Sequence, residues 1–143
     1  MAKHARTKKE VLEVGNIDSM KDWGYAPEYI EAMWKILNLE KPDDFVLATG
    51  ESHSVREFIC VAFKEINIEI VWEGEGLNEV GKDKQTGAIL IQINPTFYRK
   101  GDFKAIVGDA LKAKTTFGFD PKVKFHLLVK KMVEFDLLQG KSE

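Results

Sequence analysis

Residues 54–72, SVREFICVAFKEINIEIVW, contain a helix signal followed at once by a strand signal. Ser54 and Glu57 match the S-x-x-E pattern of a helix N-terminus, and apolar residues then recur at helical spacing as far as Ile66. From Ile68 onward, apolar and polar residues alternate, which is typical of a strand with one buried face. This change of period within one short stretch indicates an α/β fold.

The rest of the chain shows the same alternation of helix and strand patterns, without a linker rich in Pro, Gly or Ser. The run FVLAT is apolar throughout, as expected of a strand covered on both faces, whereas EGEGLNEVG is interpreted as a loop. We therefore expect one α/β domain over residues 1–143, with about four helices and four short strands. Strands are expected at residues 11–14, 45–49, 68–72 and 89–93, and helices at residues 27–37, 54–66 and 110–117 and after Pro121.

The composition excludes several classes of partner. Basic residues number 21 and acidic residues 23, so the chain lacks the overall positive charge that attracts nucleic acid. No segment approaches the ~20 apolar residues of a membrane span. Cys60 is the only cysteine and forms no intrachain disulfide, which favours a reduced, cytoplasmic compartment. We therefore expect neither a nucleic-acid nor a membrane partner.

Familiar catalytic motifs are missing from the sequence. It contains no G-x-G-x-x-G or Walker-type loop, no G-x-S-x-G and no H-E-x-x-H. His4, His53 and His126 are far apart along the chain and are interpreted as surface or capping residues rather than metal ligands. Cys60 falls within an apolar helix stripe and is interpreted as a core residue rather than a nucleophile. We predict no catalytic residue and no metal site.

The segment PTFYRKGD, residues 95–102, is a candidate polar site. Arg99 comes just after a predicted strand, and Asp102 follows three residues later. An arginine presents five donors in a planar fork that suits phosphate, and a carboxylate accepts from hydroxyl or amine donors. A ligand site and a surface ion pair are both compatible with this pattern.

Four longer stretches resemble the GDP-mannose 4,6-dehydratase family, a branch of the extended short-chain dehydrogenase/reductases. They lie in the family's order and nearly at its spacing, and they correspond to its C-terminal, substrate-binding portion. The resemblance extends from Gly15 to about Asp136 and therefore covers most of the chain. The four stretches are GNIDSMKDWGYAPEYIEAMWKIL, PDDFVLATGESHSVREF, NEVGKDKQTGAILIQINPTFYR and GDALKAKTTFGFDPKV.

The resemblance implies an activity whose catalytic parts are missing here. The family's complete enzymes convert GDP-mannose to GDP-4-keto-6-deoxymannose with a bound NADP that takes and returns a hydride. Their N-terminal portion carries a glycine-rich dinucleotide loop, a Tyr-x-x-x-Lys pair and a Thr with a nearby Glu. Neither the loop nor a Y-x-x-x-K occurs between Met1 and Glu143. We therefore expect no cofactor in this chain and no catalysis by the chain alone.

The same resemblance assigns candidate substrate-binding residues. Lys21 stands at the arginine of the family's Arg-Asp-Trp-Gly motif, which contacts the nucleotide diphosphate, and Arg99 matches a second diphosphate arginine. Asp102 stands at a glutamate that contacts the nucleotide portion, and Asn16 matches a further motif position. Arg56 also matches a motif position, but a helix-surface ion pair is an equal alternative for it.

Three ligand-side positions depart from the family pattern. Lys21 keeps the positive charge of the family's arginine but loses the bidentate fork. Lys100 replaces a proline, which removes a constraint on the backbone beside Arg99, and Asp102 is one methylene shorter than glutamate. If each change costs about 1 kcal/mol, the scale of one hydrogen bond, binding of GDP-mannose or GDP weakens roughly 100-fold.

The resemblance also bears on partners. In the family, the substrate-binding portion packs against the dinucleotide-binding sheet, so a chain standing alone should expose apolar surface. We therefore expect a homo-oligomer or a separately encoded partner with a Rossmann domain. A non-enzymatic interaction module and a functionless remnant are the alternatives to a sugar-nucleotide-binding portion.

Overall fold

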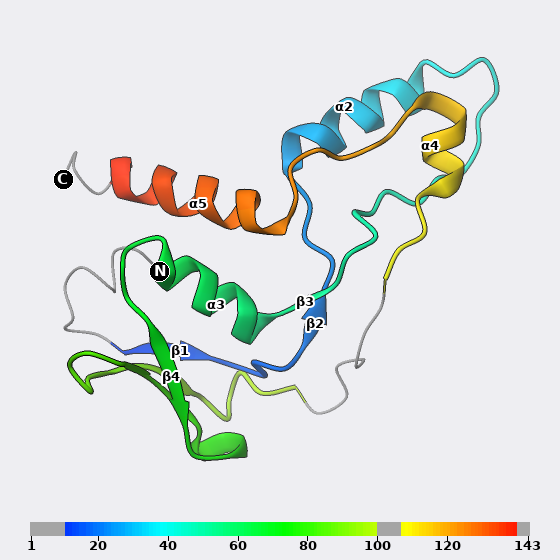
Figure 1. The fold of residues 1–143 in the computed structure, drawn as a ribbon. Helices are drawn as coiled ribbons and strands as arrows, with labels where there is room; N and C mark the ends of the chain where they lie inside the picture. Colours follow the sequence, from blue (N-terminus) through cyan, green and yellow to red (C-terminus); the bar gives the residue numbers. More distant parts are fainter. Residues whose placement is uncertain (1–10, 100–106, 140–143) are drawn as a thin grey trace.

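A four-stranded sheet forms one end of the protein (Figure 1). The structure is a computed structural model that describes residues 11–99 and 107–139. The strand order is β1-β6-β5-β4, in which β1 and β6 run parallel and the other neighbours run antiparallel. The strands are β1 (Leu12–Val14), β4 (Ile70–Glu73), β5 (Val80–Asp83) and β6 (Ile89–Ile93).

Helix α3 (Val55–Lys64) packs against this sheet and confirms the helix predicted after Ser54. The Ser54 hydroxyl accepts a hydrogen bond from the backbone N–H of Glu57 at 3.0 Å, which satisfies a donor of the first turn. Ile59 and Phe63 are buried in one cluster with Ile91 of β6. The predicted apolar stripe therefore forms the core between the helix and the sheet.

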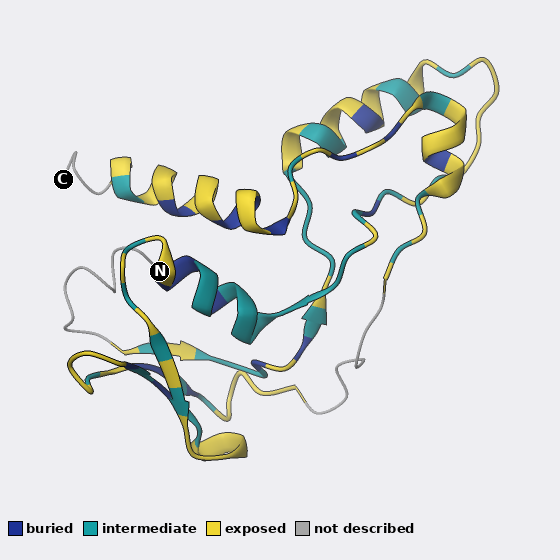
Figure 2. Cartoon of the chain, in the orientation of Figure 1, coloured by how far each residue is buried: buried dark blue, intermediate teal, exposed yellow. Residues whose placement is uncertain are grey.

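Helix α5 (Phe125–Gln139) packs on the other side of α3, so that the sheet, α3 and α5 form successive layers (Figure 1). Val129 and Val133 of α5 are buried with Ala62 of α3. The opposite face of α5 is exposed (Figure 2). A helix buried on one face only is stabilised mainly by that face.

Two further helices form a smaller unit away from the sheet (Figure 1). Helix α2 (Ala26–Leu37) and helix α4 (Leu111–Phe117) bury Ala32 and Ala113 together with Phe119. The predicted end of α4 is confirmed, because Gly118 follows it in the left-handed conformation that glycine adopts without strain, with φ 75°.

The two units are joined through a short antiparallel ladder of β2 (Met20–Lys21) and β3 (His53–Ser54) (Figure 1). Neither strand is predicted from the sequence, because two residues are too few to show an alternation. The described residues thus form four α-helices and six strands, two of them very short, in agreement with the expected α/β class. None of these helices is long and apolar enough to cross a membrane.

The strand expected at residues 45–49 is absent, and this prediction is wrong. The segment is held by side chains instead of by a neighbouring strand. Phe45 packs edge-on against Phe117 with ring centroids 5.1 Å apart, and the backbone N–H of Thr49 donates to the Asp22 carboxylate. Val46 remains 54% exposed, so the segment is not covered on both faces.

The loop expected at residues 73–81 is also wrong in part. A single 3-10 turn, η1 (Gly76–Asn78), lies within it, but β5 begins at Val80. Its residues pair with β4 on one side and β6 on the other. The sequence VGKD has only one large apolar residue, and Gly81 lies where an added Cβ would come within 2.8 Å of the end of the Ile91 side chain. β5 therefore forms because it pairs with β4 and β6, and not because of an apolar pattern in its own residues.

Candidate functional site

Residues 15–25 form a turn and strand between β1 and α2, and they contain Asn16 and Lys21. The Asn16 side chain accepts a hydrogen bond from the backbone N–H of Asp18 at 3.0 Å, which shapes the turn. Lys21 is exposed on β2 and pairs with His53 across the β2–β3 ladder. Residues paired in this way present their side chains on the same face, so Lys21 and His53 are neighbours there.

Two anchors hold this segment in place. On one side, the backbone N–H groups of Val55 and Arg56 donate to the carbonyl oxygens of Ser19 and Ile17 at 3.2 and 2.7 Å. On the other side, the Asp22 carboxylate binds the loop that precedes β3. The strand that carries Lys21 is therefore fastened to the N-terminus of α3 and to the loop at residues 48–52.

Asp22 accepts four hydrogen bonds from the loop that precedes β3. Its Oδ1 accepts from the backbone N–H of Thr49 at 3.0 Å and from the Thr49 hydroxyl at 2.6 Å. Its Oδ2 accepts from the N–H groups of Thr49 and Gly50, each at 3.1 Å. Gly50 has a φ of 77°, in the left-handed region that glycine adopts without strain.

Arg99 and Asn16 are brought to the same edge of the sheet. The carboxyl ends of the parallel strands β1 and β6 meet there, and such edges are frequent ligand sites in α/β proteins. Gly15 lies against the segment that ends at Arg99, because a Cβ on Gly15 would be 2.4 Å from the carbonyl oxygen of Phe97. Arg99 is exposed. Asp102 and Lys100 lie outside the described residues.

Arg56 is occupied by partners within the chain. Its Nε and one terminal nitrogen bind Asp18 at 3.0 and 2.9 Å, and its guanidinium also forms a bidentate pair with Glu79. The hydrogen bonds that Arg56 donates to Glu79 and, to a smaller extent, to Asp18 hold the pKa of Arg56 above its ordinary value. The guanidinium also lies 4.8 Å from the ring centroid of Trp72. Of the two alternatives for Arg56, this geometry favours the ion pair.

His53 links β3 to α5. Its ring stacks on Phe125 with centroids 3.8 Å apart, and Nδ1 lies 3.0 Å from the Glu57 carboxylate. His126 approaches to 6.5 Å between ring centroids, although it is far from His53 in sequence. Within residues 11–99 and 107–139, no group of three or more His, Cys, Asp or Glu side chains is placed to hold a metal ion.

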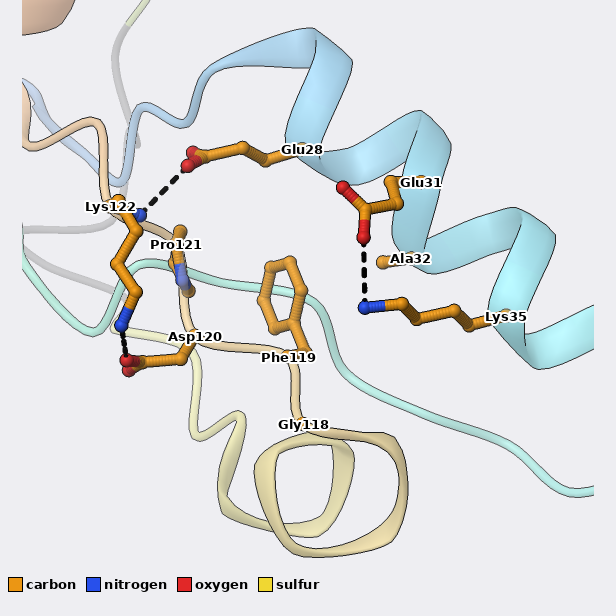
Figure 3. Close-up of a pocket in the computed structure, with 9 residues that line it drawn as sticks. All are labelled: Glu28, Glu31, Ala32, Lys35, Gly118, Phe119, Asp120, Pro121 and Lys122. Carbon is orange, nitrogen blue, oxygen red and sulfur yellow. Dashed lines mark hydrogen bonds and ion pairs between the residues drawn. The ribbon is translucent and has the colours of Figure 1, made fainter.

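A hollow lies between α2 and the segment after α4 (Figure 3). Its volume is about 210 Å³, and its charged side chains bind one another or the backbone, although Oε2 of Glu28 is buried without a hydrogen-bond partner among the described residues. Glu28 accepts from the backbone N–H of Lys122 at 2.8 Å, and Lys35 pairs with Glu31 at 2.9 Å. Hydrogen bonds from Lys122 and Lys114 lower the pKa of Asp120 to about 2. The bond between Glu28 and Lys122 fastens the segment to α2. None of the described residues that are predicted to bind substrate lines this hollow.

Sequence reasoning misses the Asp22 cluster. Asp22 is 27 residues from Thr49, and no local pattern announces a hydrogen bond over that separation. The one sequence signal that could have indicated this cluster is an aspartate in a loop, Asp22, together with the Thr49-Gly50 pair that follows the apolar run at residues 45–48. Such a pair offers successive N–H groups, and glycine allows them to converge on an anion.

Solved structures share this arrangement of helices and sheet. The chain superposes on a dTDP-glucose 4,6-dehydratase from Bacillus anthracis with a TM-score of 0.71 and 15% identity, over 98% of this chain and 38% of that one. For a UDP-glucose 4-epimerase from Thermotoga maritima the TM-score is 0.65 and the identity 21%, over 96% and 38% of the two chains. The fold is therefore that of part of a sugar-nucleotide dehydratase or epimerase.

Sequence comparison identifies the family within this class. The model of the GDP-mannose 4,6 dehydratase family matches residues 1–132, and the chain belongs to this family. It is 46% identical over 137 residues to GDP-mannose 4,6 dehydratase 2 of Caenorhabditis elegans and 44% identical over 128 residues to the human GDP-mannose 4,6 dehydratase. These matches cover 96% and 90% of this chain but only 36% and 34% of the relatives, so the chain spans about a third of their length.

Proposed function

We propose that this chain provides the sugar-nucleotide-binding elements of a GDP-mannose 4,6-dehydratase-like protein and does not catalyse the reaction alone. The observation that carries the proposal is the family match over residues 1–132, which includes the segment 15–25 and the loop it binds. In this proposal Lys21 and Arg99 supply positive charge to the diphosphate of GDP-mannose or GDP. Asn16 borders the same site, and Asp102 accepts from hydroxyl groups of the nucleotide portion.

The charged residues around the site support the assignment of Lys21 and Arg99 to diphosphate binding. Asp22 and Arg56 form hydrogen bonds that hold the surrounding segments together. Lys21 and Arg99 are both exposed, so an anion in solution can reach them. An exposed lysine binds phosphate as a point charge, with less geometric selection than an arginine fork. We therefore propose a weak site whose affinity depends on salt.

NADP does not fit the residues of this chain. The family's enzymes hold it in a glycine-rich loop between a strand and a helix, and the sequence contains no G-x-G-x-x-G. We therefore assign no hydride-transfer step to these residues, and the proposed role ends at binding and orienting the nucleotide sugar.

Calorimetric titration with GDP and with GDP-mannose tests the proposal. We expect binding by the unmodified chain, weakening of about tenfold or more in Lys21→Ala, and tighter binding in Lys21→Arg. Lys130→Ala is the matched control, because Lys130 is an exposed lysine on α5 and should leave the affinity unchanged. Absence of binding by both the unmodified chain and Lys21→Arg would contradict the proposal. Conversion of GDP-mannose in the presence of NADP would contradict its non-catalytic part.

A second candidate function is an interaction module that associates with itself or with a separate Rossmann-domain protein. One observation favours it, namely the exposed apolar residues on α2 and α5. Ile30, Trp34 and Leu37 of α2 are 64%, 64% and 84% exposed, and Phe135 and Leu138 of α5 are 60% and 64% exposed. Surfaces of this kind mark protein interfaces more often than free solvent-facing regions. A functionless remnant would show neither ligand nor partner.

A further inference from the structure

We infer that Asp22 is a positioning residue for nucleotide-sugar binding, which it supports by fixing the strand that carries Lys21. This inference rests on the proposed function. Asp22 itself does not contact ligand in this account. Its carboxylate holds the loop at residues 49–50, and the adjacent Lys21 therefore keeps a defined direction.

The contacts make Asp22 the main fastening on its side of the strand. It accepts four hydrogen bonds from three donor groups, namely the backbone N–H and hydroxyl of Thr49 and the backbone N–H of Gly50. The Thr49 hydroxyl oxygen in turn accepts from the backbone N–H of Glu51 at 3.2 Å. The chain from Thr49 to Glu51 is thus wrapped around one carboxylate.

The β2–β3 ladder is too short to hold Lys21 without this help. It pairs only Met20 with Ser54 and Lys21 with His53, and isolated two-stranded ladders are marginal in water even when longer. The backbone bonds from Val55 and Arg56 fix the other side, at Ser19 and Ile17. Lys21 therefore lies between two anchors, and Asp22 is the one made by a side chain.

A charged acceptor suits this task better than a neutral one. A carboxylate offers about four lone-pair sites and binds N–H and O–H donors more strongly than a neutral oxygen does. In Asp22→Asn, one oxygen becomes an NH₂ group that faces the same donors. The loop should then separate from β2, and Lys21 should sample several directions, which costs ordering when diphosphate binds.

Glu28 provides a matched control. Its carboxylate also accepts backbone N–H bonds from a distant segment, at 2.8 Å from Lys122 and 3.3 Å from Val123, but it lies at the hollow of Figure 3 and not beside Lys21. Asp22→Asn and Glu28→Gln therefore each remove the charge of a carboxylate that holds a distant backbone segment, at different places. A merely structural role predicts the same result for both variants.

The test measures GDP affinity by calorimetry at a temperature at which circular dichroism shows all variants folded. We expect Asp22→Asn to bind GDP about tenfold more weakly, and Glu28→Gln to lower the melting temperature with its affinity within about twofold. Thr49→Val removes only the hydroxyl donor and should weaken binding by a smaller factor. It also serves as the test if Asp22→Asn fails to fold. Unchanged affinity in both Asp22→Asn and Thr49→Val would overturn the inference.

A second readout needs no ligand and separates this inference from the proposed function. Nuclear Overhauser contacts between the backbones of Lys21 and His53 report the ladder directly. We expect them to be lost or weakened in Asp22→Asn or, if that variant does not fold, in Thr49→Val, and kept in Glu28→Gln. Their persistence in the Asp22 and Thr49 variants would overturn the positioning role. If the unmodified chain binds no GDP, the proposed function fails, and these contacts alone decide whether Asp22 orients the strand.

Discussion

At the scale of single residues, the contacts of Arg56 favour one of its two possible roles. Arg56 matches a family motif, yet Asp18 and Glu79 surround its guanidinium, and a diphosphate would have to displace both. Lys21 is exposed beside the Asp22 carboxylate. The sequence left a ligand role and an ion pair equally open for Arg56, because its partners lie 38 and 23 residues away.

Gly15 makes the edge of the sheet sensitive to substitution. A methyl group at this position would come within 2.4 Å of the carbonyl oxygen of Phe97, a distance that backbone atoms do not tolerate. We expect Gly15→Ala to lower the free energy of unfolding by about 1–3 kcal/mol, as overpacking generally does. Urea denaturation followed by circular dichroism measures this change.

The Gly15 contact involves backbone rather than a side chain, which supplies a control. Phe97→Ala combined with Gly15→Ala should not restore stability, because the carbonyl oxygen remains where it is. A Gly15→Ala variant within about 0.5 kcal/mol of the unmodified chain, the range of neutral surface changes, would show that the segment 94–99 is not seated against Gly15.

At the scale of elements, the predictions that hold are those with a local physical cause. The S-x-x-E pattern locates the start of α3, and Gly118 locates the end of α4. The expected strand at 45–49 is wrong because an apolar run specifies burial but not a pairing partner. β5 is not predicted, because its own residues show no strand pattern and its formation depends on hydrogen bonding to β4 and β6.

The exposed faces of α2 and α5 predict self-association. Phe135 and Leu138 lie one turn apart on the open face of α5, beside a groove that also includes Trp23 and Met132. Burying such side chains contributes about 1.5–3 kcal/mol each. We expect sedimentation velocity at high concentration to show a dimer or larger species, and Phe135→Lys to shift the distribution toward monomer.

Thr116→Lys adds the same charge at an exposed polar position of α4 and should leave the distribution unchanged. If the unmodified chain is a strict monomer at concentrations well above those of a cell, the prediction of self-association is wrong. The interaction-module function would then be supported only if a Rossmann-domain protein co-purifies with the chain.

At the scale of the whole molecule, the sheet, α3 and α5 form one packed unit, and α2 and α4 form another (Figure 1). Of the candidate residues that the structure describes, Lys21 and Arg56 lie where the units join, and Asn16 and Arg99 follow the strands at the neighbouring edge of the sheet. The α/β class follows from periodicity alone, whereas the position of the site came from the family resemblance. Contacts such as that of Asp22 with Thr49 join residues that are 27 positions apart, so they could not be predicted from the sequence and are known only from the structure.

Chemical-shift mapping during a titration with GDP-mannose shows directly whether the chain binds a GDP sugar at the segment 15–25. If binding occurs there, we expect backbone amide shifts to change most at Asn16, Lys21 and the loop at residues 49–53, with smaller changes near Arg99. No change at millimolar GDP-mannose, or changes confined to the hollow around Glu28 and Lys35, would contradict it.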